Sequence, residues 1–287
     1  MKTGIACDYL RIYGDRDGLE RMKKHGYDCL DYSGFIDTDS TLFSVSEAAF
    51  EQRLLQMRQA ALDCGIEISQ AHGPWRSPPH DYAPEQRAER FEKMVKSIRG
   101  AAILGCPYLV IHPIMPFGAA QDPEPQRTYE INYDFMQKLS EAGRDHNVVV
   151  CLENMPMTNL SLSRPAEILS FVKEINTPWL RICLDTGHVS VFDESPADAV
   201  RLIGKEYLRV LHVHDNNGRS DLHWIPYTGV IDWKDFSRAL QEIDFKGVLS
   251  LETAVTKEIP AHIREHFEIG LAAIAKELAN CKISNLI

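Results

Sequence analysis

A single (β/α)₈ barrel, with residues 1–287 forming one domain, is the fold class that this sequence predicts. Eight short apolar runs alternate with longer amphipathic segments along the whole chain, as expected for strands that are each followed by a helix. Several of the runs consist almost wholly of Val, Ile and Leu, which is typical of strands covered on both faces. No composition shift or long linker divides the 287 residues, a length that suits one such barrel.

The strands and helices follow from two different spacings of apolar residues. The predicted strands are Gly4–Asp8, Tyr27–Tyr32, Glu67–His72, Tyr108–His112, Val148–Glu153, Arg181–Asp185, Val210–His214 and Val248–Glu252. Three helical stripes are expected to face the core: Phe50, Leu54, Met57 and Ala61; Phe91, Val95, Ile98 and Ala102; and Trp233, Phe236, Leu240 and Ile243. Pro84 suits the first turn of the second helix, Asp232 is expected to cap the third, and Pro165 and Pro196 mark further helix starts.

A doubly wound open sheet is the structural alternative to a closed barrel. Such a sheet normally carries a Gly-rich phosphate loop after its first strand, and Cys7-Asp8-Tyr9-Leu10-Arg11 is no such loop. The sequence therefore favours the barrel and predicts no nucleotide cofactor.

Charge and composition narrow the expected partners. The formal net charge of −10 argues against a nucleic-acid partner, because DNA binding usually needs a basic face that neutralises phosphates. The densest basic group is interpreted as a solvated helix face, since acidic residues at 85, 89 and 92 are interleaved with it. That group comprises Arg87, Arg90, Lys93, Lys96 and Arg99.

The chain is expected to be cytoplasmic and to lack disulfides. No run approaches the roughly 18 apolar residues of a membrane helix, and no signal-peptide pattern follows Met1. The seven cysteines contain no CxxC pair, and all seven are expected to be reduced. Four of them lie in or beside apolar runs, where a free thiol behaves as a small hydrophobe: Cys29, Cys106, Cys151 and Cys183.

Ionisable residues stand at the ends of six consecutive predicted strands. Taken singly, a strand-end His or Glu is more often a hydrogen-bonded structural residue than a ligand. Barrel closure, however, brings all these ends around one mouth, where the active sites of this fold lie. The residues are His72, His112, Glu153, Asp185, His188, His212, His214 and Glu252, with Asp221 and His223 following the seventh strand.

Several carboxylates in one mouth would repel one another unless a cation neutralised them. A bound divalent metal is therefore predicted. Mixed imidazole and carboxylate ligands suit Zn²⁺, Mn²⁺, Fe²⁺ or Co²⁺ better than Ca²⁺, and Mg²⁺ also stays open.

The order of these strand ends resembles the xylose-isomerase-like TIM barrels, which include sugar isomerases and epimerases, inosose dehydratase and endonuclease IV. The resemblance covers the whole chain. Its most specific pieces are Leu152-Glu153-Asn154, Leu184-Asp185-Thr186-Gly187-His188, the run from His212 through Gly229, and Leu251-Glu252-Thr253. In the sugar epimerases of this family one metal is held by residues that match Glu153, Asp185, His212 and Glu252. We take His212 rather than His214, because Asp215 follows it at the spacing that the family shows.

Endonuclease IV holds three zinc ions, and its remaining ligands match further residues of this chain. These additional candidate ligands are His72, His112, His188, Asp221 and His223. A multinuclear site therefore stays open. The sequence shows no basic or intercalating insertions that would grip an abasic duplex.

The resemblance implies a metal-dependent isomerase or epimerase that acts on a sugar or sugar phosphate. The metal would polarise a carbonyl, and Glu153 and Glu252 would move protons to and from a metal-stabilised enediolate. His188 is a candidate for orienting a substrate hydroxyl, Trp75 for a pocket wall, and Arg219 for meeting a hydroxyl or phosphate.

Three alternatives stay open. One is an endonuclease IV-like zinc phosphodiesterase, another is a sugar dehydratase or lyase that removes the same proton, and the third is a binding barrel without activity. Loss of Glu153 or Glu252 would be the signature of the third, and both are present. The sequence identifies neither the sugar nor the native metal, and it leaves a homo-oligomer open.

Overall fold

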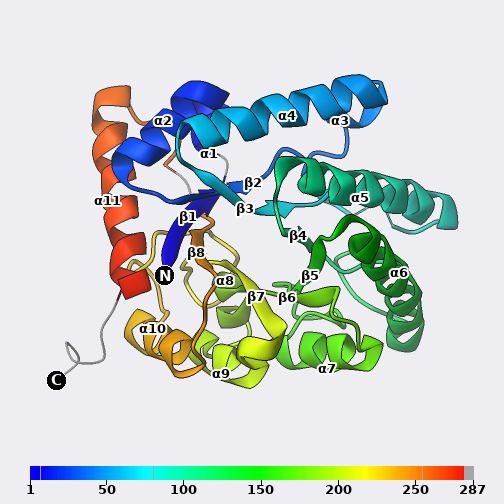
Figure 1. Ribbon diagram of the computed structural model, residues 1–287. Coiled ribbons are helices and arrows are strands. Elements are labelled where there is room, and N and C mark those ends of the chain that lie inside the picture. The colour runs from blue at the N-terminus through cyan, green and yellow to red at the C-terminus, as the bar shows by residue number, and fades with distance from the viewer. Residues whose placement is uncertain (7, 80, 254, 281–287) are drawn as a thin grey trace.

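The computed structural model describes residues 1–6, 8–79, 81–253 and 255–280. Within these residues, eight parallel strands form one sheet in the order β7-β6-β5-β4-β3-β2-β1-β8, and helices surround it (Figure 1). Two backbone hydrogen bonds connect the two outermost strands, Val213 N to Ser250 O at 2.9 Å and Glu252 N to Val213 O at 3.0 Å. These bonds bring the sheet close to full closure, and the predicted (β/α)₈ barrel is confirmed.

All eight predicted strands exist, although their ends differ. The observed strands are β1 Lys2–Ala6, β2 Cys29–Tyr32, β3 Glu67–His72, β4 Tyr108–Ile111, β5 Val149–Glu153, β6 Leu180–Asp185, β7 Leu208–His212 and β8 Val248–Leu251. The largest differences are at the first and seventh strands, which both begin and end two residues earlier than expected. Pairing with β6 stops at His212, so His214 lies in the loop that follows. Cys7, part of the first predicted strand, lies outside the described residues.

The helices between the strands also follow the expected order. They are α1 Asp8–Tyr13, α2 Asp15–His25, α3 Thr41–Ser44, α4 Glu47–Asp63, α5 Pro84–Leu104, α6 Pro125–His146, α7 Pro165–Ile175, α8 Thr186–Ser190, α9 Pro196–Tyr207, α10 Trp233–Glu242 and α11 Ala261–Asn280. Helices α5, α7 and α9 begin at the predicted prolines. The Asp232 carboxylate accepts a hydrogen bond from Asp235 N at 3.0 Å and so caps α10. Among the described residues, no helix has both the length and the apolar character needed to cross a bilayer.

Two of the three predicted helical stripes face the core as expected. In α4 the buried residues are the four predicted ones, and in α10 only Ile243, just past the helix end, is not fully buried. The stripe on α5 is different, because Met94, Ile98 and Ala101 are buried whereas Phe91 is only half-buried. Phe91 packs edge-on against Phe135 of α6, with ring centroids 5.3 Å apart. The predicted α5 stripe therefore lies partly at the contact between neighbouring helices.

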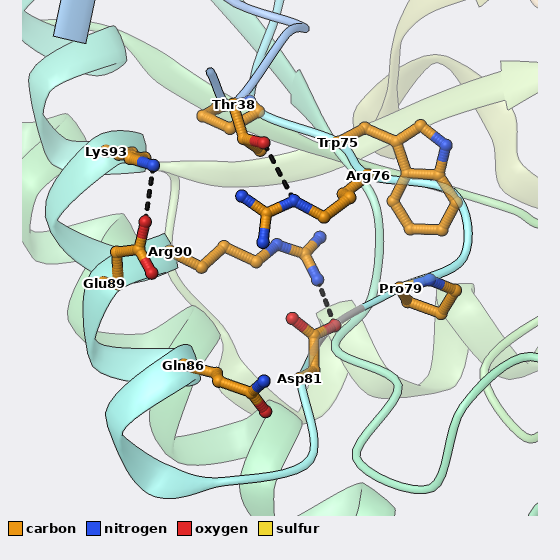
Figure 2. Close-up of a pocket in the computed structure, with 10 residues that line it drawn as sticks. Thr38, Trp75, Arg76, Pro79, Asp81, Gln86, Glu89, Arg90 and Lys93 are labelled. Atoms are coloured by element: carbon orange, nitrogen blue, oxygen red, sulfur yellow. Dashed lines mark hydrogen bonds and ion pairs between the residues drawn. The ribbon is translucent and has the colours of Figure 1, made fainter.

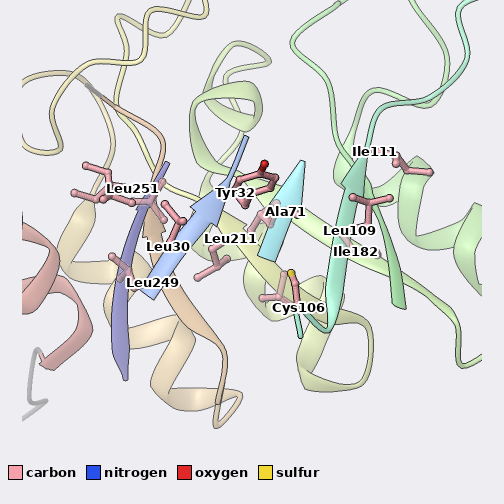
Figure 3. Packing of buried hydrophobic residues seen from close by; sticks show 14 of the residues in the cluster. Leu30, Tyr32, Ala71, Cys106, Leu109, Ile111, Ile182, Leu211, Leu249 and Leu251 are labelled. Carbon is pink, nitrogen blue, oxygen red and sulfur yellow. The ribbon is translucent and has the colours of Figure 1, made fainter. Parts of the chain in front are cut away.

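Apolar side chains form two separate layers because successive residues of a strand point to opposite faces. The larger layer fills the space between sheet and helices and includes Leu30, Leu109, Ile182 and Leu211 (Figure 3). The smaller layer consists of Val110, Cys151, Cys183 and Val210. Each of these four stands two residues before His112, Glu153, Asp185 or His212, so it shares a strand face with that residue. The small layer therefore forms the floor beneath the polar residues of the barrel mouth.

Candidate metal centre

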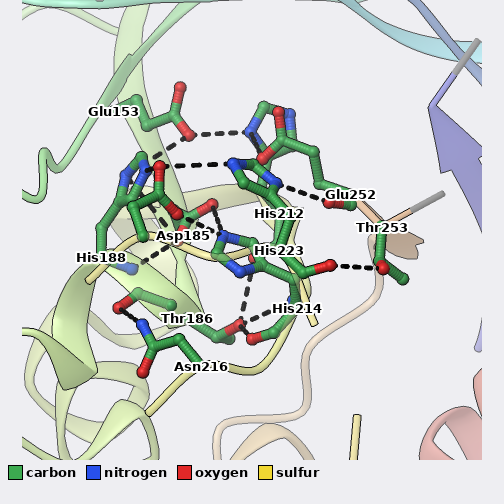
Figure 4. Close-up of polar contacts among 12 residues, drawn as sticks. Glu153, Asp185, Thr186, His188, His212, His214, Asn216, His223, Glu252 and Thr253 are labelled. Atoms are coloured by element: carbon green, nitrogen blue, oxygen red, sulfur yellow. Dashed lines mark hydrogen bonds and ion pairs between the residues drawn. The ribbon is translucent and has the colours of Figure 1, made fainter. Parts of the chain in front are cut away.

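Four side chains from the ends of β5, β6, β7 and β8 meet in the barrel mouth. One ligand atom from each of Glu153, Asp185, His212 and Glu252 lies within 4.8 Å of the others (Figure 4). His212 Nδ1 is 2.8 Å from Glu153 Oε1 and 3.3 Å from Glu252 Oε2. The geometry thus brings together the four residues that the sequence singled out, and it selects His212 over His214 for this group.

A second group adjoins the first through Glu153. His72 Nε2 and His112 Nε2 lie 3.4 and 3.0 Å from Glu153 Oε2 and 3.1 Å from each other. All three side chains are buried. Two imidazole nitrogens and one carboxylate oxygen therefore converge on a single point at the ends of β3, β4 and β5.

A third group lies on the other side of the mouth, around Asp221. Its Oδ2 atom is 3.4 Å from His188 Nε2 and 3.3 Å from His223 Nε2. His214 Nε2 is 3.6 Å from Asp221 Oδ1 and 3.0 Å from Asp185 Oδ2, so it connects this group to the first. Every additional ligand candidate from the sequence thus lies in one of three adjoining groups.

Backbone carbonyls fix the orientation of three of these imidazoles. The Nδ1 atoms of His72, His188 and His223 lie 2.8, 2.7 and 2.7 Å from the carbonyl oxygens of Gly73, Asn154 and Glu252. A carbonyl oxygen can only accept, so each Nδ1 carries the proton and, in the neutral ring, each Nε2 presents a lone pair. This is the tautomer that a metal-binding histidine needs, with its second nitrogen held by a hydrogen bond.

The buried carboxylates of the mouth are stabilised by positive charge beside them. Burial and the repulsion of Glu153 and Asp185 raise the pKa of Glu252 to about 7, even though His212 opposes them. For Glu153 burial acts upward, but His212 and hydrogen bonds from the surrounding imidazoles hold its pKa well below the usual range. Burial also opposes protonation of His188, yet nearby carboxylates raise its pKa to about 10. Protons on imidazoles therefore offset the acids wherever a metal does not.

The donor set fits a divalent cation. The residues of the three groups are His, Asp and Glu, with Cys183 beside Glu153 and His212, and none is Lys or Arg. His112 Nδ1 is buried without a hydrogen-bond partner among the described residues, and Glu153 Oε2 faces the Nε2 atoms of His112 and His72 at 3.0 and 3.4 Å. Buried polar atoms rarely stay unpaired, and a mixed imidazole and carboxylate set is one that Zn²⁺ and similar ions bind.

A short turn after β6 shapes the first and third groups. The Asp185 carboxylate accepts from His188 N at 2.7 Å and so caps α8, while Asn154 bonds Asp185 N and O at 2.9 and 3.1 Å. Between them, Gly187 lies against the His214 ring, where an added Cβ would be 1.9 Å from Cε1. The Asp-Thr-Gly-His sequence is therefore needed for close packing as well as for its ionisable groups.

The two further substrate-site candidates occupy different positions. Trp75 is half-buried and packs edge-on against His112, with ring centroids 4.4 Å apart, so it lies beside the second group. Arg219 is exposed in the loop after β7, where its backbone N–H donates to Asn217 Oδ1 at 2.9 Å. The structure brings Trp75 beside His112 at the mouth, whereas Arg219 is exposed.

One expectation for the basic face of α5 is wrong. Arg90 was assigned to a solvated surface, but it is buried, forms an ion pair with Asp81 and donates from Nη2 to His112 O at 3.1 Å (Figure 2). Asp81 Oδ2 also accepts from Met115 N at 3.1 Å. The reason is contact with the segment before α5, in which Asp81 pairs with Arg90 and the Trp75 ring centroid lies 5.8 Å from Arg90 Cζ. This pair fixes the backbone that carries His112.

Sequence reasoning missed Asp31, whose Oδ2 lies 3.1 Å from His212 Nε2. The signal was present, since Asp31 is a carboxylate inside an otherwise apolar strand, Cys29-Leu30-Asp31. Selection of residues at strand ends excludes Asp31, because it stands one residue before the end of the predicted strand Tyr27–Tyr32. His214 was considered only as a replacement for His212, and the structure gives it a separate place between Asp185 and Asp221.

Comparisons with known proteins agree with this geometry. A family model described as "Xylose isomerase-like TIM barrel" matches residues 19–274. The chain is 23% identical over 267 residues to a D-psicose 3-epimerase of Agrobacterium fabrum, covering 89% of this chain and 86% of that protein. It is also 25% identical over 185 residues to a probable endonuclease 4 of Mycoplasma mobile, covering 60% and 64% of the two chains.

A solved structure of the IOLI protein with a binding zinc atom shares the fold. It has a TM-score of 0.76 and 17% identity, and the match covers 96% of this chain and 97% of that one. The match of the family model over most of the chain identifies the family directly. This chain belongs to the xylose isomerase-like TIM barrel family.

Proposed function

We propose that this protein is a divalent-metal-dependent isomerase or epimerase of a small sugar, free or phosphorylated. One observation carries the proposal: ligand atoms of Glu153, Asp185, His212 and Glu252 lie within 4.8 Å of one another at the strand ends of a barrel. Active sites of this fold lie at that end. The similarity to sugar epimerases adds support, because it extends over most of the chain.

The proposed chemistry divides between a cation and two carboxylates. A divalent cation held by the four residues would supply Lewis-acid polarisation of a substrate carbonyl. Glu252, with a side chain 22% exposed and a pKa raised to about 7, is suited to exchanging a proton with the carbon beside that carbonyl near neutral pH. Glu153, which also lies beside His212 Nδ1 and is 1% exposed, would handle the second proton.

Three further residues would position the substrate. His188 lies between Asp185 and Asp221 with its Nε2 facing the mouth, and it would orient a hydroxyl group. Trp75 would form one wall beside His112. Arg219, two residues before Asp221 in the loop after β7, would meet a hydroxyl or phosphate group.

Isotope exchange tests this proposal. The protein loaded with Zn²⁺, Mn²⁺ or Co²⁺ is incubated in deuterated water with a panel of ketoses and their phosphates. We expect metal-dependent incorporation of deuterium at the carbon beside the carbonyl, which NMR would measure. Loss of water from the labelled sugar would identify a dehydratase, which shares the same first step. The proposal fails if no substrate of a broad panel exchanges with any of the three metals.

A phosphodiesterase is the second candidate, and the three adjoining groups of potential ligands favour it. Clustered metals can activate water and clamp a phosphate, and one relative is named a probable endonuclease 4. The net charge of −10 disfavours a grip on DNA. Metal analysis separates the candidates, because about one ion per chain supports the epimerase and three zinc ions with cleavage of an abasic oligonucleotide support the nuclease.

We also propose that the protein acts in the cytoplasm. Five cysteines are free thiols in the described part of the chain, and reduced cysteines are typical of that compartment. Cys7 and Cys281 lie outside the described residues. Recovery of the protein from a periplasmic or secreted fraction would contradict this assignment.

A further inference from the structure

We propose that Asp31, supported by Gln70, is a positioning residue that holds His212 with its Nδ1 lone pair facing the metal. The inference rests on the proposed metal centre and deepens it. Asp31 comes from β2, a strand that contributes none of the four proposed ligands. It therefore acts through His212 and is not itself one of those ligands.

Asp31 and His212 meet across the barrel interior. The Asp31 side chain is 3% exposed and its Oδ2 atom lies 3.1 Å from His212 Nε2. Gln70 on β3 donates from Nε2 to the same oxygen at 2.7 Å and to Leu211 O at 3.3 Å. One carboxylate oxygen thus receives two hydrogen bonds, and Gln70 ties it to the strand that carries His212.

Carboxylates face both ring nitrogens of His212. Nδ1 faces Glu153 Oε1 at 2.8 Å and Glu252 Oε2 at 3.3 Å, so Nδ1 is the nitrogen on the ligand side. Nε2 faces Asp31, which can accept the ring proton. With a cation at Nδ1, the ring proton would stay on Nε2, and His212 would have the opposite arrangement to His72 and His188, in which a backbone carbonyl takes the Nδ1 proton. A side chain has to perform this task because the far nitrogen of His212 points into the barrel.

Burying a carboxylate at this position costs free energy, and packing of the interior does not require it. Asp31 Oδ1 has no hydrogen-bond partner among the described residues, and Asp31 is 2% exposed. An apolar side chain would fill the interior without that cost. A carboxylate that accepts the second proton of a metal-binding histidine orients the ring and increases its basicity as a ligand.

Metal affinity measured on purified, metal-free protein tests the inference. Zn²⁺ binding is followed by competition with a chromophoric chelator, and Co²⁺ binding by its visible absorption, which reports coordination. We expect Asp31→Ala to weaken binding about 10- to 100-fold, as loss of a supporting residue around a metal ligand does. Asp31→Asn should weaken binding less, because its amide oxygen still accepts from Nε2. Gln70→Leu should weaken binding in the same direction.

Asp28→Asn is the matched control. Asp28 directly precedes β2, at the end of the strand opposite the mouth. It is exposed and accepts a hydrogen bond from Thr3 N at 3.0 Å. It should bind Zn²⁺ like the unmodified protein. Thermal unfolding without metal shows whether each variant is folded. If Asp31→Ala does not fold, Asp31→Asn and Gln70→Leu decide the question.

The outcomes separate two kinds of failure. If the unmodified protein binds neither Zn²⁺ nor Co²⁺, the proposed metal centre is wrong. If the unmodified protein binds metal and the folded variants at Asp31 and Gln70 bind it equally tightly, only the positioning role is overturned. A loss of metal-free stability with unchanged affinity and an unchanged Co²⁺ spectrum would also overturn it, because it would show a purely structural residue.

Discussion

Two buried clusters of this protein contain both histidine and glutamate, and they differ in what neutralises the acids. The mouth cluster consists of Glu153, Asp185, His212 and Glu252 with the adjoining imidazoles. The helix cluster lies between α1, α2 and α11 and consists of Tyr9, Tyr13, His25, Arg264 and Glu268. In the helix cluster Tyr9 Oη is 2.8 Å from His25 Nδ1, and Tyr13 Oη donates to Glu268 Oε1 at 2.8 Å.

The helix cluster has its own permanent cation. Arg264 Nη2 donates to Lys257 O and Ile259 O at 2.8 Å each, and its Nη1 is 3.4 Å from Tyr13 Oη. Burial raises the pKa of Glu268, so this group is easily neutralised by a proton. In the groups of the mouth that the structure describes, the side chains that can carry positive charge beside the carboxylates are titratable imidazoles. The helix cluster therefore holds a fixed positive charge, although His25 Nε2, Arg264 Nε and Glu268 Oε2 are buried without a hydrogen-bond partner among the described residues. The positive charges of the mouth cluster are titratable, so that cluster is suited to exchanging protons and cations.

The largest effect should follow removal of the proton-exchanging carboxylate from the mouth. Glu252→Gln keeps the size of the side chain but removes its acid–base function, so kcat for isotope exchange should fall about 10²- to 10⁴-fold. Steady-state kinetics with a responsive sugar would measure this. Glu258→Gln, an exposed position six residues later, is the control and should keep full activity. Unchanged turnover in Glu252→Gln would show that another group moves the proton.

Metal should stabilise the protein through the mouth cluster alone. At 100 times its dissociation constant, a metal that binds only the folded state adds about 2.7 kcal/mol to the free energy of unfolding. We expect denaturant titrations to show this gain in the unmodified protein and in Glu268→Ala. Asp185→Ala should lose most of it, whereas the exposed control Asp198→Ala should not. An equal gain in Asp185→Ala would break the distinction between the clusters.

The helix cluster should contribute to stability without affecting the metal. Glu268→Ala removes the buried acceptor of the half-buried Tyr13 hydroxyl, so it should lower the free energy of unfolding by about 1 to 2 kcal/mol. Metal affinity should not change. The control is Glu277→Ala on the same helix, because Glu277 is exposed and should contribute much less. A weaker metal affinity in Glu268→Ala would connect the two clusters.

The smallest effect concerns pH and His25. Burial lowers the pKa of His25, with help from Lys24 and Arg21 and against the influence of Glu265. Below about pH 6.5 the unfolded chain therefore binds this proton more readily than the folded protein, and stability falls as the pH drops towards the lowered pKa. Between pH 7.5 and 5.5, His25→Gln should lose up to about 1 kcal/mol less than the unmodified protein. Parallel pH profiles of unfolding would contradict this assignment.

Much of the fold could be predicted because strand periodicity and helix starts are local features. Glu67–His72 was located to the residue, and Asp232 and Pro84 were assigned correctly. The seventh strand was placed two residues late, because Val213 continues the apolar run although it pairs only with Leu251. Apolar character alone cannot distinguish a strand residue from a buried loop residue.

The candidate site was also predictable in part. Strand ends in a barrel converge, so proximity of Glu153, Asp185, His212 and Glu252 followed from the fold once the strands were known. Two other features depend on contacts between segments distant in sequence. Asp31 meets His212 across 181 positions, and Arg90 is buried in an ion pair with Asp81 from the segment before α5. Neither partner can be identified from residue spacing.

The floor beneath the mouth contains two cysteines whose chemical labelling would report opening of the barrel. Cys151 and Cys183 are 0% exposed there, and burial raises the pKa of both thiols, so both are protonated at neutral pH and inaccessible to an alkylating reagent. Thiolates are the species that such reagents attack. Labelling at these two positions should therefore proceed only when neighbouring strands separate. Its rate would measure how often the barrel opens from within.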